Sequence, residues 1–219
     1  VYFKKNTVTA LIAPSGAGKT TLFDCIAGLL KPDSGEISII TERESGSKTI
    51  ISYLFQEPRL LPSRTILENI QLPLVNVMSV EKAQIRSLYY LEKVGLGSKA
   101  FAKVSELSGG EKQRAALARA FAYPSSILLM DEAFQSQDIR LKLQLGKLFK
   151  LLLLEEPKTV IMVTHDITEA LSLSDRILVL DNSPLKIELD EQVPVQDKKS
   201  KDTTCKLWDI EQKILKILS

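Results

Sequence analysis

Residues 13–20 constrain this chain more than any other stretch, because they read Ala-Pro-Ser-Gly-Ala-Gly-Lys-Thr between a strand-like run and a helical one. This is the phosphate-binding loop pattern with Ala in place of its first Gly. Glycines let backbone N–H groups converge on phosphate oxygens at the positive end of the following helix. The pattern predicts that Lys19 reaches the β- and γ-phosphates of a nucleotide and that Thr20 binds Mg²⁺. The predicted nucleotide contacts are Ala13, Pro14, Ser15, Gly16, Ala17, Gly18, Lys19, Thr20 and Thr21.

Composition and charge narrow the class of protein further. The 219 residues are 44% hydrophobic and 26% charged, as in an ordinary globular domain. Lys and Arg number 29 against 27 Asp and Glu, so the net charge of +2 gives no support to a nucleic-acid or acidic-lipid partner. We find no run of about 20 apolar residues, the length that a membrane-spanning helix needs, and no signal-peptide pattern. These features predict a soluble protein, or one held at a membrane only by partners, with Cys25 and Cys205 as free thiols.

The rest of the chain alternates between strand-like and helix-like segments. Short apolar runs that suit central strands buried on both faces occur at residues 127–130 and 159–163. Residues 8–12 alternate weakly, and residues 36–40, 50–55 and 176–180 are further strand candidates. Helical periodicity occurs at residues 85–94, 111–121, 138–154 and 207–218, and Thr65-Ile-Leu-Glu68 fits a capping box ahead of another helix. Residues 41–48 predict a turn and residues 190–206 a polar surface linker. The pattern predicts an α/β core that carries a helical lobe.

A second candidate site element is the apolar run Ile127-Leu-Leu-Met130, which ends in Asp131 and Glu132. An acid at the carboxyl end of a strand faces the ligand crevice of an open α/β sheet. Downstream of a phosphate loop, the two acids therefore predict a catalytic pair. We expect Asp131 to contribute to Mg²⁺ binding and Glu132 to polarise a water for attack on the γ-phosphate.

The segment Leu107-Ser-Gly-Gly-Glu111, followed by Lys112-Gln-Arg114, resembles the signature loop of ATP-binding-cassette (ABC) ATPases. Taken alone, Ser-Gly-Gly is also a common helix N-cap. The other elements of the family occur in order: Gln56 resembles the Q-loop glutamine, Asp138 the D-loop aspartate and His165 the switch histidine.

The resemblance implies a P-loop NTPase fold of the ABC type, with an inserted helical lobe and a small antiparallel β part, in one domain spanning residues 1–219. Its parts would be a RecA-like α/β core (1–56 and 114–189), the lobe with the signature loop (57–113), and a polar linker with a C-terminal helix (190–219). It also implies ATP hydrolysis by a head-to-tail homodimer. The implied roles are catalysis by Glu132, His165 and Gln56, Mg²⁺ binding by Thr20, Gln56 and Asp131, dimer communication by Asp138, and contacts to the partner's ATP by Ser108, Gly109, Gly110 and Glu111.

A finer resemblance lies in Phe55-Gln-Glu-Pro-Arg-Leu-Leu-Pro62, which is similar to the ATPase subunits of nitrate/sulfonate/taurine-type importers. It implies import of a small solute, ATP and Mg²⁺ as cofactors, and permease subunits and a substrate-binding protein as partners. It also implies a peripheral location on the cytoplasmic face of the inner membrane and no nucleic-acid partner. Two alternatives stay open: a soluble ABC ATPase acting on nucleic acid or ribosomes, and a nucleotide-binding regulatory subunit with little turnover.

Three features depart from the family pattern. Ala13 replaces a glycine that the broader phosphate-loop pattern also allows to be Ala. The segment from Glu132 to Asp138 is more polar than the usual Ser-Ala-Leu-Asp D-loop. The family stacks adenine on an aromatic residue of a strand upstream of the loop, whereas Tyr2 is close to the loop and that strand is expected to be missing. If nothing replaces that aromatic residue, a stacking contact worth roughly 1–3 kcal/mol is lost, and we expect similar affinities for ATP and GTP. The alternative is that Tyr2 or a residue of a partner covers the base.

Overall fold

The computed structural model describes residues 1–219 except 15, 41–50, 136, 183–184, 195–200 and 219. The chain forms two compact units. We call the first the phosphate-loop unit; it comprises Val1–Ile51, Leu129–Glu132 and Thr159–Ser219. The second, the helical unit, comprises Ser52–Leu128 and Ala133–Lys158. Among the described residues, no helix combines the length and the apolar character needed to cross a bilayer.

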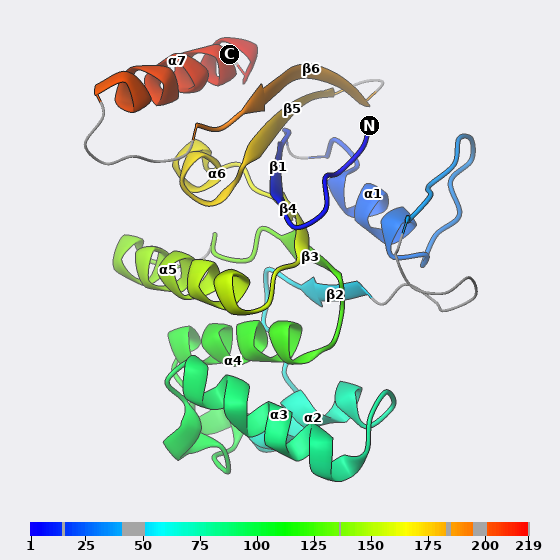
Figure 1. Ribbon diagram of the computed structural model, residues 1–219, viewed down its shortest axis with the longest axis vertical. Coiled ribbons are helices and arrows are strands. Elements are labelled where there is room, and N and C mark those ends of the chain that lie inside the picture. The colour runs from blue at the N-terminus through cyan, green and yellow to red at the C-terminus, as the bar shows by residue number, and fades with distance from the viewer. Residues whose placement is uncertain (15, 41–50, 136, 183–184, 195–200, 219) are drawn as a thin grey trace. The chain divides into compact units, whose positions relative to one another are not determined.

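The phosphate-loop unit is built on parallel strands (Figure 1). Every residue of β1 (Val8–Ile12) is buried, which explains its apolar, non-alternating sequence. This strand pairs in parallel with β4 and β5, and β5 pairs antiparallel with β6. The strand order is β2-β3-β4-β1-β5-β6. The other elements are α1 (Lys19–Ile26), β3 (Ile127–Asp131), β4 (Thr159–Val163), α6 (Ile167–Leu173), β5 (Arg176–Asn182), β6 (Leu185–Gln192) and α7 (Lys201–Leu218).

The helical unit begins at Ser52, within β2 (Ile51–Leu54). Its helices α2, α3 and α4 pack against one another (Figure 1). Helix α2 starts at the predicted capping box: Thr65 Oγ1 accepts from Glu68 N–H at 3.1 Å, and Thr65 N–H donates to Glu68 Oε2 at 2.8 Å. The elements are α2 (Ile66–Leu74), α3 (Val80–Lys93), α4 (Gly109–Ala122), α5 (Ile139–Glu155) and two 3₁₀ turns (Gly97–Lys99, Val104–Glu106).

Two local predictions are wrong. Residues 36–40 form no strand in the described structure; Ile37 and Ile40 are 41% and 97% exposed, and a strand needs a partner to satisfy its backbone. The predicted linker 190–206 is interrupted at both ends, because β6 extends to Gln192 and α7 begins at Lys201. The predicted turn at 41–48 lies outside the described residues.

Candidate functional site

The phosphate loop follows β1 directly, at the carboxyl end of that strand. Gly16 has φ 82° and Gly18 has φ 84°, a left-handed conformation that residues with a Cβ rarely adopt. Gly18 is the N-cap of α1 and supplies no side-chain cap, so the first N–H groups of α1 stay available to an anion. Ser15 lies outside the described residues.

Lys19 folds back over this loop. Its side chain is only 9% exposed, and Nζ donates to the carbonyl oxygens of Ala13 and Pro14, both at 2.9 Å. The same Nζ lies 3.9 Å from Glu132 Oε1. The structure thus brings the loop lysine next to the predicted catalytic acid, although more than half of the chain separates them in sequence.

Glu132 follows β3 in an unusual backbone conformation. Its φ is 46°, in the left-handed region that costs a residue with a Cβ about 1–3 kcal/mol. Its N–H donates to the carbonyl of Val163 on β4 at 3.0 Å, and its Oε1 lies 3.8 Å from His165 Nδ1. Strain of this kind persists where the surroundings hold it, and it is frequent at functional sites.

His165 directly precedes Asp166, the N-cap of α6, and hydrogen bonds of its two chain neighbours hold the backbone there. Asp166 is the N-cap of α6 and accepts from Glu169 N–H at 3.1 Å. Thr164 Oγ1 accepts from Asp166 N–H at 3.0 Å. These bonds fix the backbone on either side of His165, whose imidazole Nδ1 lies 3.8 Å from Glu132 Oε1; the switch-histidine role stays a prediction.

The predicted Mg²⁺ ligands offer a hydroxyl, a carboxylate and an amide oxygen, which are the ligand types that this ion prefers. Thr20 is exposed at the start of α1, and Asp131 ends β3 in the same unit. The donor chemistry of Thr20 and Asp131 fits a magnesium site. Gln56 belongs to the helical unit, where its Nε2 donates to Gln135 Oε1 at 3.5 Å.

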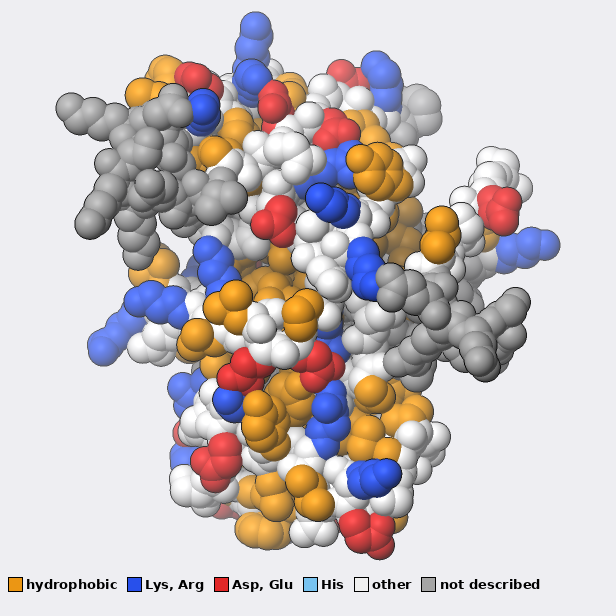
Figure 2. Space-filling model, in the orientation of Figure 1, with side chains coloured by type: hydrophobic (Ala, Val, Ile, Leu, Met, Phe, Trp, Pro, Cys, Tyr) orange, Lys and Arg blue, Asp and Glu red, His pale blue; other side chains and the backbone are white. Residues whose placement is uncertain are grey.

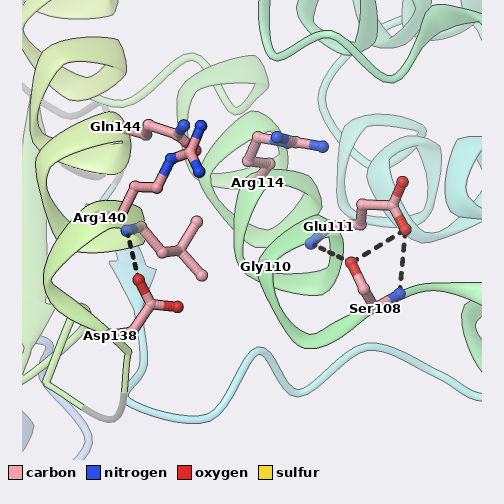
Figure 3. A pocket seen from close by; sticks show the side chains of 8 residues that line it. Ser108, Gly110, Glu111, Arg114, Asp138, Arg140 and Gln144 are labelled. Atoms are coloured by element: carbon pink, nitrogen blue, oxygen red, sulfur yellow. Dashed lines mark hydrogen bonds between the residues drawn. The ribbon is translucent and has the colours of Figure 1, made fainter.

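The predicted signature residues form the start of α4 in the helical unit (Figure 3). Ser108 is the N-cap, with a capping box to Glu111. A Cβ on Gly110 would lie 2.9 Å from Leu141 Cδ2, so the Leu141 side chain of α5 would have to shift to admit one. Among the described residues beyond its own helix turn, none lies within 4 Å of a Cβ on Gly109. The start of α4 borders a pocket of about 330 Å³, which is also lined by Arg114, Asp138, Arg140, Leu141 and Gln144.

Asp138 has a structural contact that the sequence did not indicate. Its carboxylate accepts from Leu141 N–H at 2.9 Å and so caps α5. Sequence reasoning also missed Arg119, which donates to the carbonyls of Pro58 and Arg59 at 2.7 and 2.8 Å. Burial lowers the pKa of Arg119. In the sequence, Arg119 stands out as a cation within the alanine-rich run of α4, and this signal could have marked it as a residue with a specific contact.

Glu111 gives the signature loop a testable pH dependence. Lys99 Nζ lies 2.7 Å from Glu111 Oε1 and Ser108 N–H donates to Oε2 at 3.0 Å; these contacts lower the pKa of Glu111 from 4.5 to about 2. The stabilisation is therefore present above about pH 4.5 and disappears as the pH falls toward about 2. We expect Glu111→Gln to lower the urea midpoint at neutral pH, and this difference to shrink below about pH 4.5. A difference that is independent of pH in parallel urea titrations would contradict this account.

Tyr2 lies at the wrong end of the sheet to contact a nucleotide on the phosphate loop. Its carbonyl accepts from Arg176 Nη1 at 2.8 Å, and the Arg176 guanidinium lies 5.3 Å from its ring. Arg176 pairs with Thr9 in the first half of β1, whereas the loop follows the other end of that strand.

We expect Tyr2→Ala to change the affinity for ATP by less than about twofold, because a lost stacking contact would cost roughly 1–3 kcal/mol and this ring is not placed to stack. Calorimetric titration of the parent and the variant with ATP measures the change. A tenfold loss would show that Tyr2 reaches the base.

A parallel sheet, a loop after β1 with two glycines at positive φ, and two acids at the carboxyl end of β3 together define the class of this protein. It is a nucleotide-binding protein of the P-loop type. A family model described as "ABC transporter" matches residues 1–135. The chain therefore belongs to the ABC transporter family.

Known relatives agree with this assignment. "Aliphatic sulfonates import ATP-binding protein SsuB 1" of Mesorhizobium japonicum is 40% identical over 186 residues, which is 85% of this chain and 69% of that protein. The protein of the same name from Rhodococcus jostii is 40% identical over 180 residues, 82% of this chain and 70% of that protein.

The dimeric structure of MJ0796, described as a bacterial ABC transporter cassette, shares the fold with a TM-score of 0.74 and 32% identity over 90% of this chain and 89% of that one. A second structure of MJ0796 is described as a post-hydrolysis state bound to ADP and Pi. The predicted ABC ATPase fold is thereby confirmed.

Proposed function

We propose that this chain binds and hydrolyses ATP to drive import of a small solute. The observation that carries the proposal is the grouping of Lys19, Glu132 and His165, with Glu132 Oε1 3.9 Å from the ammonium and 3.8 Å from the imidazole. A phosphate-binding cation, a carboxylate and a histidine in one place are the parts that nucleotide hydrolysis needs. The sulfonate-import relatives support this function and its solute class.

The roles of the residues follow from their chemistry. The N–H groups of the loop and of α1 bind the phosphates, and Lys19 moves from the carbonyls of Ala13 and Pro14 to phosphate oxygens. Glu132 accepts a proton from the attacking water, and His165 orients the γ-phosphate beside it. Thr20, Asp131 and Gln56 would hold Mg²⁺, which would supply positive charge to offset the charge of the phosphoryl group.

The signature loop has a role in a head-to-tail homodimer. The start of α4 offers backbone N–H groups to the γ-phosphate of the partner's ATP, as helix N-termini do for anions. The open space around Gly109 supports this role, because no described residue outside its own helix turn lies close enough to require a glycine there. The contacting residues would be Ser108, Gly109, Gly110 and Glu111, with Asp138 linking the two sites.

The proposed assembly is peripheral to the membrane. Permease subunits would hold the dimer at the cytoplasmic face of the inner membrane, and a substrate-binding protein would deliver the solute. On the face drawn in Figure 2, Lys and Arg side chains are interspersed with Asp and Glu. This mixture gives no support on that face to action on nucleic acid, for which a patch of positive charge is typical.

The test is phosphate release from ATP by the purified chain, with and without Mg²⁺. We expect release that stops when the ion is chelated. A chain that binds ATP without releasing phosphate, both alone and with its permease in vesicles, would instead identify the regulatory alternative.

A further inference from the structure

Gln113, near the start of α4, is a completely buried polar residue outside the predicted site. Its Nε2 donates to the backbone carbonyl of Ala133. Its Oε1 is buried and has no hydrogen-bond partner among the described residues. A buried amide that uses only its donor is a poor choice for stability alone. The contact with Ala133 is therefore the feature that needs an explanation.

Ala133 follows Glu132 directly in the chain. Glu132 has φ 46°, a conformation that persists only where neighbouring contacts hold it. On its N-terminal side, the backbone is held by the bond from Glu132 N–H to the carbonyl of Val163, at 3.0 Å. On its C-terminal side, the backbone is held by Gln113. The strained residue is thus secured by one hydrogen bond on each side.

The geometry points to Gln113 as a positioning residue for Glu132: its hydrogen bond to Ala133 keeps Glu132 in the left-handed conformation that directs the carboxylate toward Lys19 and His165. This inference rests on the proposed function, in which Glu132 is the general base. Because Gln113 belongs to the helix that begins at Ser108, it also ties the backbone next to the base to the helix that carries the signature loop.

The first test is Gln113→Leu, which has a similar volume, removes the donor and also removes the unpartnered oxygen. We expect kcat for ATP hydrolysis to fall roughly 10- to 100-fold, as for a misplaced catalytic group, while KM changes less than about twofold. The control is Gln84→Leu on α3, where the side chain is exposed and kcat should be unchanged. An unchanged kcat in folded Gln113→Leu, with only a lower melting temperature, would overturn the inference.

A second variant, Gln113→Glu, tests the hydrogen bond itself. A carboxyl group can donate to Ala133 only when it is protonated, and burial favours that form. We expect the ratio of its kcat to that of the parent to rise as the pH is lowered from about 8 to about 6; a low ratio that does not change with pH would overturn the inference. Absence of phosphate release by the parent would overturn the proposed function as well, whereas an active parent beside a fully active Gln113→Leu would overturn this inference alone.

Discussion

Replacing Glu132 with Gln is expected to reduce ATP turnover by about 10²–10⁴-fold while ATP binding is retained. The amide cannot accept the proton of the attacking water, yet it keeps the length and hydrogen-bonding reach of the carboxylate. Phosphate contacts made by the loop and by Lys19 are left in place. Phosphate release and calorimetric ATP titration on the same preparation separate the two effects, and the variant should also dimerise when ATP is added.

A matched control for this variant is Glu106→Gln, since Glu106 caps a short 3₁₀ turn by accepting from Lys103 N–H in the helical unit. It makes the same chemical change in a carboxylate with no predicted role in catalysis. We expect its turnover to equal that of the parent. Turnover of Glu132→Gln within about threefold of the parent, well short of the loss typical for a general base, would remove Glu132 from that role.

Local signals were sufficient for much of the fold. The capping box at Thr65 and Glu68 fixed the start of α2 because both hydrogen bonds form within four residues. The short apolar run at Thr159–Val163 identified β4 as a strand covered on both faces. β6 was missed although Leu185, Ile187 and Leu189 alternate with polar residues, because its polar second half resembles a linker.

The candidate site was less predictable than the fold. The loop Ala13–Thr20 and the acids after β3 are marked by local patterns, and the family resemblance named the other positions. By contrast, the left-handed φ of Glu132 and the hydrogen bond from Gln113 to Ala133 depend on contacts between distant parts of the chain. No spacing rule in a single sequence encodes such contacts, so only the folded chain reveals how the proposed base is held.

Lys19→Ala tests the phosphate loop itself, and we expect it to abolish most ATP binding. A charge-assisted contact from a buried ammonium is worth roughly 1.5–3 kcal/mol, which corresponds to about a 10- to 150-fold loss of affinity. Lys19 Nζ donates to the carbonyls of Ala13 and Pro14 and lies 3.9 Å from Glu132 Oε1, so its removal also takes two hydrogen bonds from the loop. Calorimetry with ATP measures the loss.

The control is Lys31→Ala. Lys31 is an exposed lysine after α1, so this variant removes the same charge without touching the loop and should bind ATP as the parent does. If Lys19→Ala and Lys31→Ala bind ATP equally well, residues 13–20 are not a phosphate site. The catalytic role proposed for Glu132, which requires ATP bound at this loop, would then fail as well.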